Sequence, residues 1–217
     1  MSNPNKNLKK NRVDFNKNES INYNHISDSP YDLFNSWLEE AFLVDKDNAN
    51  AFVLSTVSKD SLPSSRVVLL RGLSNDGLIF FTNYNSHKSL ELSNNNNVSV
   101  NFFWPELEKQ VRIKGAVCKI SDQESDDYFD SRPVDSQLGA ILSNQSEDIP
   151  LGYDLSEKLV RLRSDLNNRK IDRPEYWGGY LIKANYFEFW QGRPSRLHDR
   201  LCYTFINGLW KKSRKSP

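Results

Sequence analysis

The chain has 217 residues and a formal net charge of +1 at pH 7, with 37% hydrophobic and 26% charged residues. This length favours one domain with a sizeable core. The balanced charge gives no global field that would attract nucleic acid, and there is no run of about 18 apolar residues to predict a membrane span. We therefore expect a cytoplasmic globular protein that binds neither nucleic acid nor membranes.

The N-terminal stretch is rich in Asn, Lys and Ser and lacks the apolar centre of a secretory signal. We predict that residues 1–25 form a mobile polar arm and that residues 26–217 form a single domain. Cys118 and Cys202 could pair, but neither lies in a metal-ligand pattern such as CxxC. We therefore expect reduced thiols and no metal site.

Residues 30–42 follow a Ser-Pro helix entry and carry apolar residues at helical spacing, which predicts an amphipathic helix. The period then changes to that of strands. Short apolar runs predict strands at residues 51–57, 65–71, 78–83, 98–104 and 110–117, with a short helix at 86–92.

Two more helices are predicted at 121–129 and 155–166, and two strands at 176–182 and 186–190. Apolar residues on both sides of Asn207-Gly208 predict a closing hairpin. Many short strands with helices between them predict a mainly β, α+β fold: an antiparallel barrel of Greek-key type with peripheral helices. No GxGxxG motif follows a strand, so a Rossmann nucleotide site is not supported.

Two groups of basic and hydroxyl residues lie near the ends of predicted strands. Arg66 and Arg71, five apart, would point to opposite faces of a regular strand; they are either phosphate ligands or solvated strand ends. Thr82, Ser86 and Lys88 form either a phosphate cradle or an ordinary capped helix start.

A second candidate anion site follows the helix predicted at 121–129. Tyr128 and Arg132 are four apart and would share a helical face. Pro133 predicts that the helix ends near Arg132. With Ser136 these residues could bind an anion; the alternative is a helix-terminal arginine without a ligand.

Other chemistry-bearing side chains have simpler interpretations. His87 is expected to be solvated and without an acidic partner. Glu124, Asp126 and Asp127 are expected to form a solvated helix face and not a catalytic carboxylate pair.

The most informative stretch is residues 187–200, Phe-Glu-Phe-Trp-Gln-Gly-Arg-Pro-Ser-Arg-Leu-His-Asp-Arg. Arg196 and His198 are two apart, so on an extended segment both side chains would leave the same face. A cation beside an imidazole suits an anionic planar ligand and proton chemistry.

Nine segments, in order over roughly residues 30–217, resemble the pyridoxamine 5'-phosphate oxidase family of flavoproteins, which have the FMN-binding split β-barrel fold. The segments are Arg66–Arg71, Phe81–Asn83, Ser86–Lys88, Lys109–Val111, Tyr128–Phe129 with Ser131–Pro133, Asp135–Ala140, Ser143–Ser146, Trp177–Gly179, and Phe189–Gln191 and Gly192 with Arg196–Arg200. The resemblance implies a homodimer with FMN at the subunit interface and a C-terminal dimerisation region. It also implies that dioxygen oxidises pyridoxine 5'-phosphate or pyridoxamine 5'-phosphate to pyridoxal 5'-phosphate, with release of hydrogen peroxide and, from the amine, ammonia.

The resemblance assigns roles by position. The FMN site would comprise Arg66, Val67, Leu69, Arg71, Phe81, Thr82, His87, Lys88, Gln110, Gln145, Ser146, Trp190 and Arg200. The substrate site would comprise Arg12, Arg71, Tyr128, Arg132, Ser136, Arg196 and His198. Of these, Arg196 and His198 would be catalytic.

The sequence departs from the family pattern at several positions, among them Asn48, which stands where Asp is usual. Arg71 stands where Lys is usual, His87 where Arg is usual, and Phe15 roughly where a Tyr covers the substrate. Two alternatives follow: an FMN or pyridoxal phosphate carrier with weakened chemistry, and another split-barrel flavoprotein of nitroreductase-like or haem-handling type. The first is opposed by the retention of Arg132, Ser136, Arg196 and His198. The second is opposed by the intact segments Ser131–Pro133 and Arg196–His198.

Overall fold

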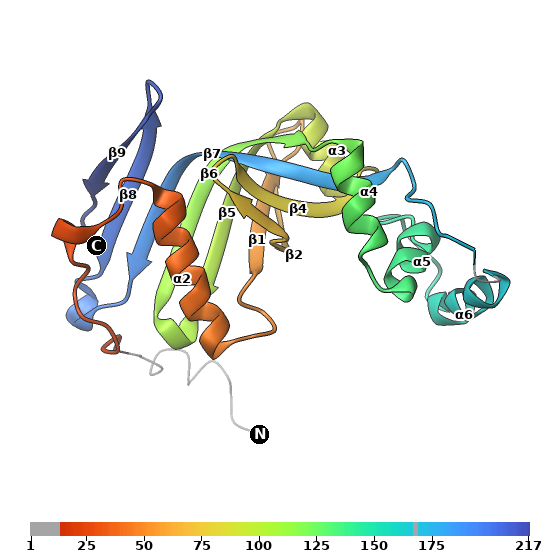
Figure 1. Cartoon of the computed structure of the whole chain (residues 1–217), viewed down its shortest axis with the longest axis horizontal. Helices are drawn as coiled ribbons and strands as arrows, with labels where there is room; N and C mark the ends of the chain where they lie inside the picture. Colours follow the sequence, from red (N-terminus) through yellow and green to blue (C-terminus); the bar gives the residue numbers. More distant parts are fainter. Residues whose placement is uncertain (1–13, 167–168) are drawn as a thin grey trace. The chain divides into compact units, whose positions relative to one another are not determined.

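The structure is a computed structural model that describes residues 14–166 and 169–217 (Figure 1). The described chain divides into two compact units. The terminal unit contains the described part of residues 1–50 together with 101–113 and 185–217, and the central unit contains 51–100 and the described part of 114–184.

The strands lie within one hydrogen-bonded order, β2-β1-β5-β6-β7-β4-β3, with β8 pairing with β7 and β9. They are β1 (Ala51–Val57), β2 (Pro63–Leu69), β3 (Gly72–Ser74), β4 (Gly77–Asn83), β5 (Asn97–Trp104), β6 (Lys109–Lys119), β7 (Trp177–Gln191), β8 (Asp199–Ile206) and β9 (Leu209–Arg214). The pairs β1–β2, β3–β4, β4–β7, β7–β8 and β8–β9 are antiparallel.

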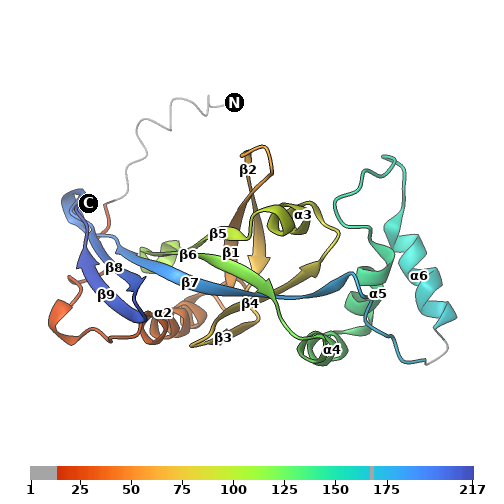
Figure 2. The same cartoon turned by 90° about the horizontal axis from the view of Figure 1, so that it is seen from above.

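The helices match the predicted positions with one addition. They are α2 (Pro30–Val44), α3 (His87–Asn94), α4 (Asp122–Asp130), α5 (Val134–Leu142) and α6 (Leu155–Asp165), and 3-10 turns occur at Tyr23–His25, Pro105–Leu107 and Pro194–Arg196. Helix α5, which lies beside α6 in Figures 1 and 2, was not predicted. Its sequence, VDSQLGAIL, has Pro133 as the N-cap and a glycine in its interior, which obscure the helical pattern.

The terminal unit has an aromatic core between α2 and the second half of β7. Trp37 packs edge-on against Phe189 at 5.2 Å between ring centroids, and Phe34 packs against Phe102 at 5.0 Å. These rings are buried, so the apolar stripe predicted for the helix at 30–42 faces the strands.

In the central unit, Phe52, Leu54, Leu78 and Phe80 are almost fully buried and belong to its core. A smaller cluster beside it joins the helices to the start of β7 through Phe129, Leu138, Ile171 and Trp177. This cluster fixes the corner between α4 and α5, where the second predicted anion site lies.

The prediction of two strands at 176–182 and 186–190 was wrong, because β7 runs unbroken for 15 residues. Lys183 and Asn185 interrupt the apolar pattern, yet their side chains are exposed while the backbone stays in strand conformation. Among the described residues, no helix is long and apolar enough to cross a membrane.

Candidate functional site

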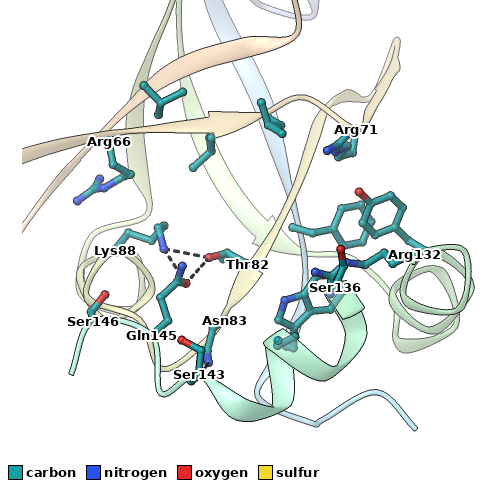
Figure 3. A pocket seen from close by; sticks show the side chains of 18 of the residues that line it. Arg66, Arg71, Thr82, Asn83, Lys88, Arg132, Ser136, Ser143, Gln145 and Ser146 are labelled. Atoms are coloured by element: carbon teal, nitrogen blue, oxygen red, sulfur yellow. Dashed lines mark hydrogen bonds between the residues drawn. The ribbon is translucent and has the colours of Figure 1, made fainter. Parts of the chain in front are cut away.

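A cavity of about 1100 Å³ opens in the central unit (Figure 3). Strands β2 and β4, the start of α3, the α4–α5 corner and the loop after α5 provide its walls. Its lining includes these predicted site residues: Arg66, Val67, Leu69, Arg71, Phe81, Thr82, His87, Lys88, Tyr128, Arg132, Ser136, Gln145 and Ser146. Sequence positions 80 residues apart therefore meet in one cavity.

One end of the cavity is organised by Lys88, a buried cation. Its Nζ donates to Thr82 Oγ1 at 3.0 Å, to Ser86 Oγ at 2.9 Å and to Gln145 Oε1 at 3.1 Å; Figure 3 shows the Thr82 and Gln145 contacts. Burial, and secondarily the charge of Arg66, lower the pKa of Lys88 to about 8. Ser86 is the N-cap residue of α3, but its side chain makes no capping hydrogen bond to the helix. The alternative of an ordinary capped helix start is therefore wrong.

Arg66 and Arg71 line the same cavity, which corrects the prediction of opposite faces. Strand β2 ends at Leu69, so the alternation of a regular strand does not extend to Arg71. The Arg71 backbone N–H instead donates to Ile79 O on β4 at 2.8 Å.

The other end of the cavity contains a cation with unused hydrogen-bonding capacity. The Arg132 guanidinium lies 4.5 Å from the ring centroid of Trp177, and its buried Nη1 has no hydrogen-bond partner among the described residues. Burial is the main cause of its lowered pKa, Tyr128 opposes this shift, and Arg71 adds to it. Arg132 lies beyond the end of α4, so the prediction that it shares a helical face with Tyr128 was wrong.

The donor set of the cavity fits phosphate groups. Each end combines cations with hydroxyls: Lys88 with Thr82 and Ser86 at one end, and Arg132 with Ser136 at the other. A buried guanidinium N–H without an acceptor is costly in free energy, and a bound anion would remove that cost. The cavity thus has the donors expected of a binding site for one ligand with two separated anionic groups, or for two anionic ligands.

Arg196 and His198 lie in the terminal unit. Residues 194–196 form a 3-10 turn in which Ser195 and Arg196 have φ values of 58° and 61°, so the premise of an extended segment was wrong. His198 Nδ1 accepts the Arg193 backbone N–H at 3.1 Å. In the neutral ring this leaves the proton on Nε2. Burial first, and then the charge of Arg196, lower the pKa of His198, which favours the neutral form.

The His198 ring is part of an aromatic group. Trp190 lies 4.7 Å from it and Phe15 lies 5.7 Å from it, between ring centroids. Phe15 also packs edge-on against Trp190 at 5.5 Å. A Cβ placed on Gly192 would lie 2.7 Å from Phe15 Cβ, so only glycine allows this approach.

The described part of the N-terminal arm continues along the same unit. Tyr23 Oη and Ser20 Oγ donate to the buried Asp199 carboxylate at 2.8 and 3.1 Å. Arg193 donates to the Asn18 carbonyl. Arg12, predicted to contact substrate, lies outside the described residues, and the mobility of residues 1–25 stays a prediction.

Arg200 is held by a buried carboxylate. Its Nε and Nη2 donate to Glu188 Oε1 at 2.9 and 2.6 Å. Burial alone would raise the pKa of Glu188, but hydrogen bonds from Arg200 and Tyr186 hold it below its ordinary value. Trp190 is the cross-strand partner of Arg200, and Gln110 is half-buried on β6.

Side-chain contacts also test the predictions for His87 and for the acidic face of α4. His87 is exposed as predicted, but its Nδ1 lies 3.7 Å from Glu91 Oε1, so the expectation of no acidic partner was wrong. The two residues are one helical turn apart, a spacing that could have signalled the contact. Of the acidic face on α4, Asp126 is bound by Arg173 Nε at 2.6 Å.

Trp177 was assigned no role in the sequence, yet its ring forms the wall beneath Arg132. The two glycines that follow Trp177 could have signalled a closely packed segment. A Cβ on Gly178 would lie 2.3 Å from Tyr84 Oη, so a side chain does not fit there. Cys118 and Cys202 are free thiols. Within the described ranges there is no group of three or more metal-ligating side chains.

The fold is shared with solved structures. PhzG from Burkholderia lata, in complex with tetrahydrophenazine-1-carboxylic acid, superposes with a TM-score of 0.84 at 27% identity, covering 93% of this chain and 98% of that one. A pyridoxamine 5'-phosphate oxidase-related, FMN-binding protein from Nostoc punctiforme gives 0.73 at 15% identity, covering 88% and 100%. The chain therefore has the split-barrel fold, as predicted.

The sequence comparisons are more specific. Residues 38–153 match the sequence model of pyridoxamine 5'-phosphate oxidase, and residues 177–217 match that of the pyridoxine 5'-phosphate oxidase C-terminal dimerisation region. The pyridoxine/pyridoxamine 5'-phosphate oxidase of Christiangramia forsetii is 48% identical over 196 residues, covering 88% of this chain and 90% of that relative. The one from Cytophaga hutchinsonii is 42% identical over 215 residues, covering 97% and 100%. This chain belongs to the pyridoxamine 5'-phosphate oxidase family.

Proposed function

We propose that this protein is an FMN-dependent oxidase that converts pyridoxine 5'-phosphate or pyridoxamine 5'-phosphate to pyridoxal 5'-phosphate. Dioxygen is the electron acceptor, hydrogen peroxide is released, and the amine substrate also yields ammonia. The observation that carries the proposal is the cavity with a cation-and-hydroxyl group at each end, one of which includes the unpartnered Nη1 of Arg132. The family named above makes this reaction the first to test.

The end organised by Lys88 suits the phosphate of FMN. Arg66, Thr82, Lys88 and Gln145 would hold it, because a buried ammonium and a guanidinium beside hydroxyls bind a phosphate through charge-assisted hydrogen bonds. Val67, Leu69, Phe81, His87 and Ser146 line the same cavity and would complete this part of the cofactor site. When bound, FMN supplies the redox chemistry, taking a hydride equivalent from the substrate and passing the electrons to dioxygen.

The end organised by Arg132 suits the substrate phosphate. Arg132 would bind it with Nη1, and Tyr128, Ser136 and Arg71 would add a phenol, a hydroxyl and a second guanidinium. The stacked rings of Phe81 and Tyr128, 3.8 Å apart, make this part of the wall rigid. Holding the substrate by its phosphate orients the pyridine ring, which lowers the entropic cost of reaction.

His198 and Arg196 would act on the ring of the substrate and its C4' substituent. His198 is held in one tautomer by the Arg193 N–H, so its Nε2–H is available as a donor to the C4' oxygen or nitrogen. Arg196 would bind the ring electrostatically and favour departure of the hydride equivalent. Gln110, Trp190 and Arg200 would contact the flavin.

The proposal includes a homodimer with FMN at the subunit interface, so that site residues come from two copies of the chain. The match of residues 177–217 to a dimerisation region supports it. A weakly active FMN- or pyridoxal phosphate-binding protein is the second candidate, and His87, Arg71 and Phe15 are the residues that favour it.

The test is an assay of purified protein with added FMN and pyridoxine 5'-phosphate in air. Pyridoxal 5'-phosphate and peroxide in equal amounts would establish the oxidase. A protein that binds FMN and makes neither product would establish the binding function instead.

A further inference from the structure

A buried carboxylate contacts two residues that line the cavity, Arg66 and His87, without lining it itself. Glu91 on α3 keeps only 4% of its side chain exposed. Ser64 Oγ lies 2.8 and 2.7 Å from its two carboxylate oxygens, and Thr56 donates a short hydrogen bond to Oε2. The carboxylate therefore joins α3 to both strands of the β1–β2 hairpin.

The same two hydroxyls hold Arg66. Arg66 Nη1 donates to Thr56 Oγ1 and Nη2 donates to Ser64 Oγ, both at 2.5 Å, and Nη2 also lies 3.2 Å from Glu91 Oε2. Each hydroxyl can donate its hydrogen to Glu91 and accept from Arg66 with a lone pair. Glu91 therefore orients the two hydroxyl acceptors of Arg66, whose Nη1 also donates to the Leu54 and Ser64 carbonyls at 3.2 and 3.3 Å, and it neutralises the charge of Arg66.

Glu91 remains ionised in this network. Burial alone would raise its pKa, but hydrogen bonds from Thr56 and Ser64, and then the charges of His87 and Arg66, hold the pKa below its ordinary value. His87 faces the same carboxylate from the next turn of α3, at 3.7 Å. Arg66 and His87, which both line the cavity, thus share one carboxylate partner.

We propose that Glu91 is a positioning residue for the phosphate-binding end of the cavity, acting through Arg66. The inference rests on the proposed function, which assigns the FMN phosphate to Arg66. A long arginine side chain loses considerable rotamer freedom when it is fixed. Glu91 fixes Arg66 before the phosphate binds, so the loss of rotamer freedom does not weaken phosphate binding.

The test is a double-mutant cycle on FMN affinity, measured by flavin fluorescence in titrations of the ligand-free protein. Glu91→Ala and Arg66→Ala are each expected to weaken FMN binding about tenfold or more, the loss of one charge-assisted contact. The double variant is expected to bind no more weakly than Arg66→Ala alone, because Glu91 acts only through that side chain. Losses that multiply in the double variant would overturn the proposal.

A second substitution separates positioning from folding. Glu91→Gln keeps the shape and one acceptor oxygen, so FMN affinity should lie between those of wild type and Glu91→Ala. If thermal melting shows Glu91→Ala to be unfolded, the cycle is run with Glu91→Gln, and an affinity equal to wild type then overturns the proposal.

The matched control is Glu157→Ala, which removes an exposed helical glutamate whose ion-pair partner in the described part of the chain is Arg161 on α6. Its FMN affinity should equal that of wild type. Wild-type protein that does not bind FMN would contradict the proposed function itself, whereas normal wild-type binding with multiplicative losses would contradict only the role of Glu91.

Discussion

The guanidinium of Arg132 lies over the indole ring of Trp177, 4.5 Å from its centroid, with one buried nitrogen lacking a hydrogen-bond partner among the described residues. The aromatic face stabilises the cation, while the free N–H leaves it able to bind an anion. Of the buried side-chain polar atoms in the described chain, this is the one without a partner. It is therefore the strongest single indication of where a ligand binds.

Arg132→Lys should raise KM for pyridoxine 5'-phosphate about tenfold or more, because a lysine lacks the planar fork that binds phosphate through two nitrogens. FMN affinity should change less than about twofold, since the residue lies at the other end of the cavity from Lys88. Steady-state kinetics and an FMN titration measure the two effects. An unchanged KM would refute the assignment of the substrate phosphate to Arg132.

FMN affinity should fall as pH rises above about 8, the pKa of Lys88 without ligand. The sign follows from the charges: a bound phosphate favours the ammonium, so FMN binds best while Lys88 is protonated. Above that pKa, protonation must accompany binding, and Kd should rise by about tenfold per pH unit. Titrations between pH 6 and 9.5 measure this slope, and Lys88→Arg should abolish it because arginine stays charged.

His87→Arg should tighten FMN binding, because it places a permanent cation on the cavity wall where the wild type has an exposed imidazole. The gain should be about 1 kcal/mol, as for an exposed charge, and should shrink as salt is added. The check is FMN titration at low and high ionic strength. Equal affinity of the two proteins at low salt would show that position 87 does not face the phosphate.

Arg196→Ala should lower kcat/KM about a hundredfold, about 2.7 kcal/mol of transition-state stabilisation, with little loss of FMN affinity. The reason is that Arg196 is proposed to contact substrate and not flavin. Arg196→Lys, which keeps the charge, should recover part of the activity. A parallel loss of FMN affinity in Arg196→Ala would move this residue to the cofactor site.

Gly192→Ala should displace Phe15, since the added Cβ would lie 2.7 Å from both Cβ and Cγ of that ring. The expected cost is about 1–3 kcal/mol of stability, typical of overpacking. Thermal unfolding measures it. Phe15→Gly in the same background removes both clashing atoms and should restore most of the loss, and a persistent loss would locate the strain elsewhere.

Much of this protein could be predicted from local patterns. The amphipathic stripe at 30–42 and the apolar run at 51–57 predicted α2 and β1 because helical and strand periodicity are properties of neighbouring residues. The nine ordered segments identified the family for the same reason, since each is a short motif. The roles given to individual site residues, and the single domain at 26–217, stay predictions.

The sequence by itself determined the family and the types of most elements, though not α5 or the unbroken β7, and tertiary structure decided which side chains meet. Lys88 binds Gln145 across 57 positions, and Glu91 binds Thr56 across 35, contacts that no periodicity encodes. The left-handed turn at Ser195 and Arg196 also escaped prediction, because non-glycine residues adopt that conformation only where the surrounding structure compensates its cost. Local propensity sets backbone conformation over a few residues, whereas the position of a charge in a cavity depends on strand register and packing between distant segments.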